Sequence, residues 1–385
     1  MKRQFSIIII FFLVFHFLLP CLYFLIFGFV NLYSDVQGYV GCLINMISLL
    51  GTLLVIKKMP TIDNVPLKEY NHLSSFFLIS LFITLYKFYS SGGYSGALEG
   101  SSHGTLISFL SIFFNVTVSF FLVICLQKRI KYVYIWICLY VSVMTIAGSR
   151  SAVLGVLLLF LYIPLFANYK SIYRKLKKIL LVLTIVSPIL FFYATSVRGE
   201  IDTELLSKII IGRISFVELS MIPLQSKQEV SMDQKVFEEK YSLNNQIKQV
   251  VNTVTPIDFF EYDVSPNQYF RQIFLGASER TVLDSYMSIN MTLPVYFVME
   301  TNYVVGILLT IIFLSFLFWI WVHYASNRYI FIAILFSMYD FLYYFDWIMI
   351  TQSIFSICLT LLALDVWEKV LNSICFTCQK YKKII

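Results

Sequence analysis

The chain has 385 residues, of which 59% are hydrophobic and 13% are charged, and its formal net charge is +7. Soluble domains average about 45–50% apolar and about 25% charged residues, so this composition excludes an ordinary soluble protein. Apolar runs of about 20 residues recur along the chain, and each is long enough to cross a hydrocarbon core of about 30 Å. We therefore predict an all-α fold, that of a polytopic helical membrane protein.

The excess of positive charge does not indicate a nucleic-acid-binding protein, because the basic residues lie in short turns between the apolar runs. The basic residues at the start of the chain precede the apolar run 5–30, an order that is also found in signal peptides. This run is too long for a signal peptide and lacks a small-residue cleavage site. It is therefore expected to be the first membrane span.

About ten membrane-spanning helices are expected, seven of them in 1–195 and three in 303–385, where a short tail follows the last span. The expected spans are 5–29, 37–56, 73–90, 105–126, 132–148, 151–167, 179–195, 303–322, 329–345 and 347–365. The connections after the even-numbered spans are rich in Lys and Arg, and such connections are retained in the cytoplasm. This pattern predicts that both termini are cytoplasmic and that the long loop 196–302 lies on the outer face.

The long loop carries most of the acidic residues of the chain and four of its nine arginines. These arginines are Arg198, Arg213, Arg271 and Arg280. The stretch 204–224 is apolar enough to lie on the membrane as an interfacial helix. The stretch 225–249 is charged and is expected to be solvated and mobile, with no chemistry assigned to it. The stretch 271–300 is expected to return to the membrane as a helix.

A fifth arginine lies in the tight reversal between the fifth and sixth spans, Gly148-Ser149-Arg150-Ser151-Ala152. Arg150 there can simply extend its side chain to the outer interface. Positive charge is, however, disfavoured in outer turns, and the hydroxyls of Ser149 and Ser151 flank the guanidinium. This placement favours a functional role for Arg150, on the same face as the long loop.

Polar residues inside membrane spans are energetically costly, so they are candidates for function. The clearest are Asp340 in the ninth span and Lys87 near the outer end of the third. Asp346 lies among aromatic residues at an outer turn, which is typical of an interfacial belt. His16 and Asn115 are expected to form hydrogen bonds between helices.

Arginines at an outer membrane face suit a lipid-linked diphosphate, because a guanidinium binds phosphate oxygens in a fork and stays charged on partial burial. A diphosphate leaving a sugar carbon would be stabilised by that charge. Attack by a sugar hydroxyl needs a base, and the loop contains no histidine. The candidate bases are Glu279, Asp284 and Glu300, with Glu200 and Asp202 behind them. The pair Glu261 and Asp263, without a histidine or a third acid, favours a surface position over a metal site.

The run Gly148–Ala152 resembles the G-S-R-[SG]-A signature of the O-antigen polymerase and ligase superfamily, in which an arginine-rich outer loop late in the chain precedes the final spans. Asn290-x-x-Leu293, followed by Glu300 and Gly306, loosely resembles the return helix H-N-x-x-L…E-x-G-x-x-G of that superfamily. The spacing from Asn290 to Glu300 is wider here, and Gly306 stands one place late. Asn302 stands where the first glycine is expected, and Ile289 where the ligase branch has histidine, which favours the polymerase branch (Wzy type) and leaves the base unassigned.

The resemblance implies an enzyme of the bacterial inner membrane that moves a growing glycan from its undecaprenyl diphosphate carrier to the sugar of a lipid-linked repeat unit. It implies a metal-independent reaction without a cofactor, in which Arg150 and the loop arginines bind the diphosphate. Membrane lipids and a chain-length regulator protein are its expected partners. The alternatives are an O-antigen ligase, a lipid-linked oligosaccharide flippase or transporter, and an outward-facing acyltransferase or glycosyltransferase of another family.

Overall fold

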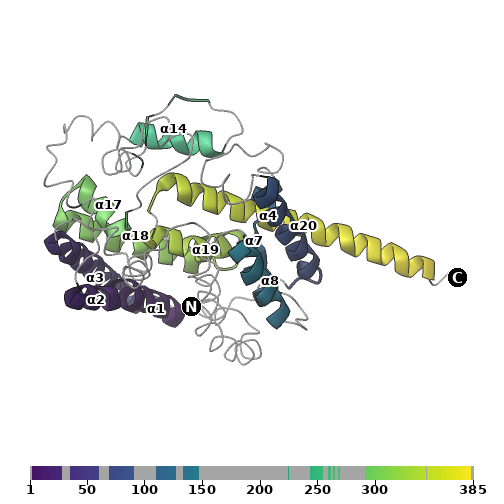
Figure 1. Ribbon diagram of the computed structural model, residues 1–385, viewed down its shortest axis with the longest axis horizontal. Coiled ribbons are helices and arrows are strands. Elements are labelled where there is room, and N and C mark those ends of the chain that lie inside the picture. Colours follow the sequence, from purple (N-terminus) through teal and green to yellow (C-terminus); the bar gives the residue numbers. More distant parts are fainter. Residues whose placement is uncertain are drawn as a thin grey trace. The chain divides into compact units, whose positions relative to one another are not determined.

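A computed structural model of the chain describes residues 2–27, 35–59, 69–90, 110–126, 133–146, 224, 243–254, 259–261, 263–264, 268, 291–343 and 345–382 (Figure 1). Throughout these ranges the regular structure is helical, without strands. Four of the described helices are long and apolar enough to cross a membrane: Phe5–Phe27, Val36–Lys58, Leu73–Ser90 and Tyr303–His323. They coincide with the first, second, third and eighth expected spans. The chain is thus an all-α protein with helices suited to a membrane.

The chain divides into two compact units. Unit 1 contains Met1–Ile62, Asp202–Tyr324 and Ile334–Phe355, and unit 2 contains Asp63–Ile201, Ala325–Ala333 and Ser356–Ile385. Among the described residues, the helices of unit 1 are α1 (Lys2–Phe12), η1 (Leu13–Leu18), α2 (Leu19–Phe27), α3 (Asp35–Lys58), α14 (Leu243–Val254), α17 (Leu293–Glu300) and α18 (Tyr303–His323). The helices of unit 2 are α4 (Leu73–Ser90), α7 (Val116–Leu126) and α8 (Val133–Ile146). Two helices, α19 (Arg328–Tyr343) and α20 (Trp347–Lys382), contribute residues to both units.

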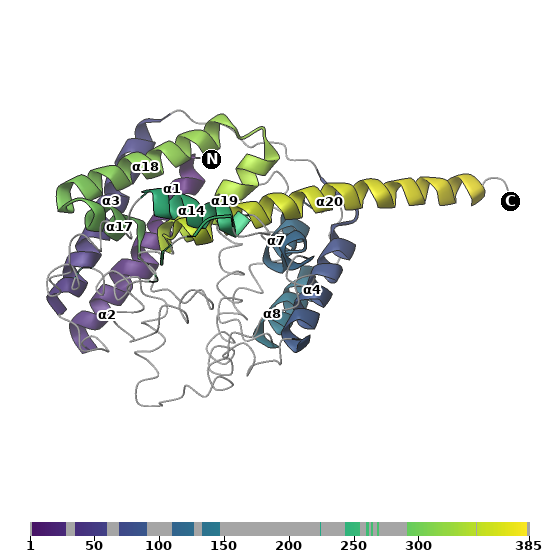
Figure 2. The same ribbon diagram turned by 90° about the horizontal axis from the view of Figure 1, so that it is seen from above.

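The helix α20 is longer than the span expected at 347–365, because it continues to Lys382 (Figures 1 and 2). The shorter apolar helices α7, α8 and α19 begin and end within, or within a residue of, the fourth, fifth and ninth expected spans. The sixth and seventh expected spans, 151–167 and 179–195, lie outside the described residues. The interfacial helix expected at 204–224 also lies outside them, apart from its last residue.

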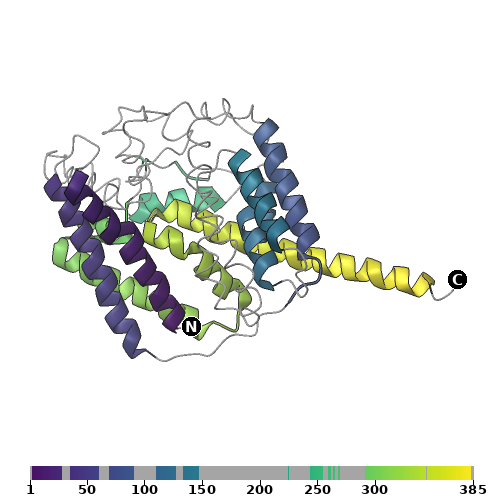
Figure 3. The ribbon, with the colours of Figure 1, turned by 60° about the horizontal axis from the view of Figure 1, so that its bottom comes forward.

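In unit 1, α1 and α2 run antiparallel to α3 (Figure 3). The ammonium group of Lys2 donates to the carbonyl of Met59 at 2.9 Å and to that of Lys57. The ring of Phe5 lies 4.8 Å from that of Phe318 and 5.6 Å from that of Trp321. The start of α1, the end of α3 and the end of α18 therefore share one end of unit 1, called the Lys57 end below.

The first span contains a six-residue π-helix, η1, between α1 and α2. Pro20 follows it in α2 and has no N–H to donate to the carbonyl of His16, four residues earlier. A local widening of the helix accommodates such a missing hydrogen bond. The imidazole of His16 is buried between aromatic rings. Its centroid lies 5.1 Å from the centroid of the Phe12 ring.

The helices α17 and α18 pack tightly against each other across a two-residue break. Thr301 and Asn302 separate them, and the Asn302 side chain caps α18 by accepting from the backbone N–H groups of Val304 and Val305 at 3.1 and 3.0 Å. A Cβ atom on Gly306 would lie 2.5 Å from the backbone nitrogen of Val298, so only glycine fits this approach.

The helix expected over 271–300 does not reach Glu300 unbroken. Thr292 has extended backbone angles, φ −75° and ψ 152°, and α17 begins only at Leu293. A proline lies in its first turn, where a missing N–H removes no helical hydrogen bond. Residues 271–290 lie outside the described residues.

In unit 2, the fourth expected span is interrupted at Asn115, whose side-chain oxygen caps α7 by accepting from the N–H groups of Thr117 and Val118, both at 3.1 Å. The amide of Asn115 donates to the hydroxyl of Ser356 on α20 at 3.2 Å, which confirms the expected hydrogen bond between helices. The carbonyl of Ile112, freed by the interruption, accepts from the Ser356 and Thr360 hydroxyls at 3.2 Å. A neighbouring helix thus satisfies the backbone groups of the break, as an apolar environment demands.

We expect Gly306→Ala to lower the free energy of unfolding by about 1–3 kcal/mol, because the added methyl group meets the backbone of α17, which cannot move aside. Thermal unfolding of the detergent-purified protein measures this loss. Gly51→Ala in α3 is the matched control, since its methyl group would meet only the flexible end of the Ile311 side chain. Equal melting temperatures for the two variants would contradict the close approach of α17 and α18.

Candidate functional site

Most of the residues predicted to bind the diphosphate or to act as bases lie outside the described residues. These are Arg150, Arg198, Arg213, Arg271, Arg280, Ser149, Ser151, Asn290, Glu279 and Asp284, together with Glu200 and Asp202. The structure does describe the third base candidate, Glu300, and the two intramembrane candidates, Asp340 and Lys87.

Glu300 is the last residue of α17, and Tyr296 lies one helical turn before it on the same face. The hydroxyl of Tyr296 donates to the side-chain oxygen of Gln246 at 3.1 Å, and both of these residues are buried. Gln246 belongs to α14, which precedes α17 by 50 residues in the chain. We call Glu300, Tyr296 and Gln246 the Glu300 cluster.

The surroundings of the Glu300 cluster shift the protonation of its acidic groups. Burial raises the pKa of the Glu300 carboxyl above its usual value, and hydrogen bonding with Tyr296 and then with Gln246 opposes that rise without cancelling it. Burial, and after it the negative charge of Glu300, raises the pKa of the Tyr296 phenol, which stays protonated at neutral pH. The residue as a whole is nevertheless exposed at the helix end, so protein surrounds its carboxyl only in part. A reachable carboxylate with a raised pKa has the properties of a general base.

Aromatic side chains enclose the buried side of the Glu300 cluster. The ring of Phe345 lies 4.7 Å from that of Tyr296 and 4.9 Å from that of Trp347. The backbone N–H of Phe345 donates to the carbonyl of Met291 at 2.9 Å, which ties the turn before α20 to the residues before α17. Asp346 in the same turn accepts from the N–H of Ile348 at 2.8 Å and so caps α20. These neighbours exclude water from Tyr296 and hold α17 in place.

The helix α14 corrects the prediction that 225–249 is a solvated segment, since its residues from Leu243 onward form a helix with a buried amide face. Asn245, Gln249 and Asn252 are spaced as on one face of a helix. They hydrogen-bond backbone groups of the stretch 259–264. This spacing was visible in the sequence, but nothing there pointed to Gln246 as a partner of Tyr296.

The two intramembrane candidates are each paired with a serine within their own unit. The Ser353 hydroxyl of α20 donates to the Asp340 carboxylate of α19 at 2.6 Å in unit 1. The Lys87 ammonium group of α4 donates to the Ser111 hydroxyl at 3.4 Å in unit 2. Both contacts satisfy a costly polar group between helices, and neither residue belongs to the Glu300 cluster.

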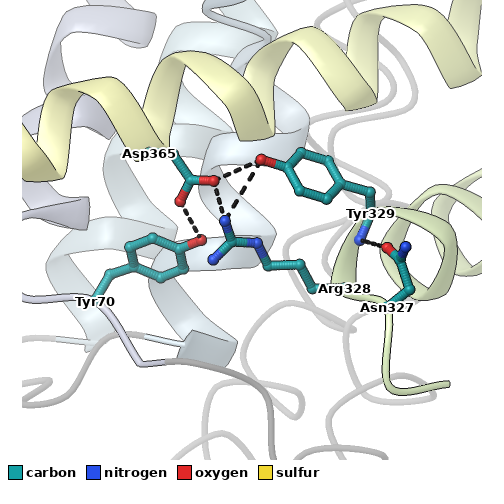
Figure 4. Close-up of polar contacts among 5 residues, drawn as sticks. All are labelled: Tyr70, Asn327, Arg328, Tyr329 and Asp365. Carbon is teal, nitrogen blue, oxygen red and sulfur yellow. Dashed lines mark hydrogen bonds and ion pairs between the residues drawn. The ribbon is translucent and has the colours of Figure 1, made fainter.

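A second polar cluster lies in unit 2, around Asp365 of α20 (Figure 4). Its carboxylate accepts from the hydroxyls of Tyr70 at 3.0 Å and Tyr329 at 2.6 Å, and it pairs with the Arg328 guanidinium. One turn further along α20, the buried Glu368 carboxylate accepts from the two backbone N–H groups just before α4, at 2.9 and 3.0 Å.

The Asp365 carboxylate has three donors, and Arg328 also lies over the rings of Tyr70 and Tyr329 at 5.8 and 5.1 Å. Burial, followed by the charge of Asp365, raises the pKa of Tyr70, so this phenol remains a donor at neutral pH. A carboxylate with three partners from other segments ties helices together, which indicates a structural role.

No group of three metal-ligating side chains occurs among the described residues. Within that part of the chain, Glu261 is exposed, and the Asp263 carboxylate accepts from the N–H of Val264 at 2.8 Å. Glu261 thus lies at the surface, whereas Asp263 is half-buried.

Comparisons with protein-family models, with curated proteins and with solved structures found no match to this chain.

Asp365→Asn is expected to lower the free energy of unfolding by about 1–3 kcal/mol, because the charge opposite Arg328 is lost. Thermal unfolding in detergent checks this value. Lys369→Gln, on an exposed face of the same helix, should leave the melting temperature within about 1 °C of the wild type. A melting temperature for the Asp365 variant equal to that of the control would show that the ion pair contributes nothing.

Proposed function

We propose that the chain is an O-antigen polymerase of the Wzy type, which joins undecaprenyl-diphosphate-linked oligosaccharide repeat units at the outer face of the bacterial inner membrane. The proposal includes ten spans, cytoplasmic termini and a periplasmic loop over 196–302. The run Gly148–Ala152, with Arg150 at its tip, and the four arginines of the loop support it from the sequence. Their permanent charge suits a diphosphate headgroup.

The observation that carries the proposal is the position of Glu300 in unit 1. The helix α18 begins just after Glu300 and ends beside the Lys57 end, 21 residues later, a separation of about 30 Å. Lys2, Lys57 and Lys58 lie at that Lys57 end, and a basic end faces the cytoplasm by the positive-inside rule. Glu300 then lies at the outer face, where a lipid-linked diphosphate has its headgroup.

The reaction follows from these groups. The Glu300 carboxylate takes the proton of the acceptor hydroxyl as that oxygen attacks the anomeric carbon of the donor glycan. The bond between this carbon and the diphosphate oxygen breaks, and undecaprenyl diphosphate leaves with the electron pair. The arginines neutralise the charge that develops on the diphosphate. No metal is required, because the guanidinium groups supply the positive charge.

The alternative functions would require other arrangements of charged and catalytic residues. A flippase or transporter would carry its charged groups along a path through many spans, whereas Asp340 and Lys87 are each bound to a serine of a neighbouring helix. A ligase would be expected to use a histidine where this chain has Ile289. Both observations favour the polymerase.

Deletion of the gene tests the proposal directly. Surface polysaccharide from the deletion strain, separated on a gel, should collapse from a ladder to a single repeat unit on the lipid core. Loss of every glycan-capped lipid species would instead indicate a ligase or a flippase. An unchanged ladder would overturn all three functions.

Replacing Glu300 by Gln should reduce polymerisation at least about 100-fold, because an amide cannot accept the proton. Incorporation of synthetic lipid-linked repeat units into polymer measures the rate. The charge-matched control Glu238→Gln, in the stretch to which no chemistry is assigned, should retain the wild-type rate. Wild-type activity in the Glu300 variant would remove it as the base.

The rate should rise with pH through the pKa of Glu300, since only the ionised carboxylate accepts a proton, and burial places that pKa above the usual value of about 4.3. Tyr296→Phe removes hydrogen bonding that lowers the pKa of Glu300. This variant should therefore shift the acidic limb of the pH–rate profile to higher pH. Tyr303→Phe, exposed at the start of α18, is the control and should leave the limb in place.

Arg150→Lys should impair polymerisation, because an ammonium group cannot form the two-pronged contact of a guanidinium with phosphate oxygens. The ladder made by the complemented deletion strain measures the defect. Lys240→Gln, in the charged stretch of the loop, should restore the ladder fully. A full ladder from the Arg150 variant would remove this residue from the proposed site.

A further inference from the structure

Two neighbouring phenylalanines of the long loop are exposed. Phe259 exposes 62% and Phe260 46% of its surface. Two adjacent aromatic residues leave a large apolar area in water, which costs free energy unless a ligand covers it. Lipid covers exposed apolar residues within the expected spans, whereas this pair lies in the loop outside them.

The backbone of this pair is held by one buried side chain. The Asn252 oxygen accepts from the N–H groups of Phe259 and Phe260 at 3.1 and 3.2 Å, and its amide donates to the carbonyl of Phe260 at 2.7 Å. Three hydrogen bonds thus fix the position from which both rings project. A surface that is already ordered loses little conformational entropy when it binds a ligand.

A second anchor follows three residues later in the chain. The side-chain oxygen of Asn245 accepts from the N–H of Asp263 at 2.8 Å, and its amide donates to the carbonyls of Asp263 and Val264 at 3.3 Å. Val264 is fully buried. The stretch on the C-terminal side of the phenylalanine pair is therefore also fixed to α14, and both anchors hold the pair in its exposed position.

We propose that Phe259 and Phe260 form a stacking platform for sugar rings of the glycan, an inference that rests on the proposed function. The C–H groups on one face of a pyranose ring are weakly positive and pack against the negative face of an aromatic ring. The exposed Glu261 beside the pair offers acceptors for sugar hydroxyls. Its charge would be costly to place in the hydrocarbon layer, which favours a glycan over the bilayer as the occupant.

The platform is connected to the Glu300 cluster through α14. Asn252 of this helix holds the phenylalanine pair, and Gln246 of the same helix bonds Tyr296. Six residues of helix separate them, a rise of about 9 Å. An oligosaccharide that stacks on the platform and reaches from it to Glu300 would retain the acceptor chain between successive transfers.

Binding of the glycan alone tests the platform. The probe is the surface polysaccharide of the source strain, freed from its lipid by mild acid, and saturation-transfer NMR reports its contact with the full chain in nanodiscs. Replacing both Phe259 and Phe260 by Ala should weaken binding about tenfold or more. Ile247→Ala, which removes another exposed apolar side chain of α14 that is 52% accessible, is the control and should bind normally.

Phe260→Trp preserves a ring and should retain wild-type affinity, which separates the loss of stacking from a loss of folding. The same variant reports on the lipid alternative in nanodiscs of dibrominated phosphatidylcholine. Quenching of its added fluorescence would place this residue in the bilayer and overturn the inference, whereas unquenched fluorescence supports it.

The ladder on a gel separates this inference from the proposed function. If deletion of the gene shortens the ladder to one repeat but the double Ala variant binds the polysaccharide normally, the platform is wrong and the polymerase stands. If deletion leaves the ladder unchanged, the proposed function fails, and this inference fails with it. The supporting result is a double Ala variant with wild-type melting temperature, weakened binding and shorter polymer.

Discussion

The direct contact between the backbones of α17 and α18 positions Tyr296 and Glu300 in unit 1. Because residue 306 is glycine, Val298 lies against α18 with no side chain between them. This contact orients α17, so that Tyr296 faces α14 and Glu300 ends the helix at an exposed position. A bulkier residue at position 306 would push α17 away and separate the phenol from Gln246, even though Gly306 touches neither of them.

A second constraint is that polar groups in an apolar environment need partners. The break in the fourth expected span is tolerated because Asn115 caps α7 and the hydroxyls of α20 bond the freed carbonyl of Ile112. Glu368 does the same for the N–H groups at the start of α4. In unit 2 the polar side chains of α20 therefore mostly maintain the fold, whereas Glu300 in unit 1, an exposed residue with a partly buried carboxyl, remains accessible to a ligand.

The helix α14 hydrogen-bonds both to Tyr296 and to described residues of the stretch 259–264. Its amide face replaces water as the hydrogen-bonding partner of the stretch 259–264, in the way that side chains commonly satisfy loop backbone. The same helix supplies Gln246 to the Glu300 cluster. One short helix thus links an exposed aromatic pair with a carboxylate of raised pKa, and both belong to the stretch that the sequence separates from the membrane spans.

The sequence by itself determined that the chain is helical with apolar helices suited to a membrane, four of them almost to the residue, and that Asn115 forms a hydrogen bond between helices. It could do so because a run of apolar residues long enough to cross lipid is a local property, and so is an isolated polar residue within such a run. The helix expected over 271–300 was wrong near its C-terminal end, since Thr292 is extended, and the stretch from Leu243 was a helix with buried amides rather than a solvated segment.

Only the tertiary structure decided which of these groups meet. Tyr296 and Gln246 are 50 residues apart, and Tyr70 and Asp365 are 295 apart. Hydrogen bonds across such separations depend on how helices pack, which the order of residues does not reveal locally. The pKa of Glu300 depends on the same packing, because burial at the end of α17 raises it. Composition and periodicity are local properties of the chain and can be read from its sequence. The partners and the hydration of a side chain are decided only when distant segments pack together.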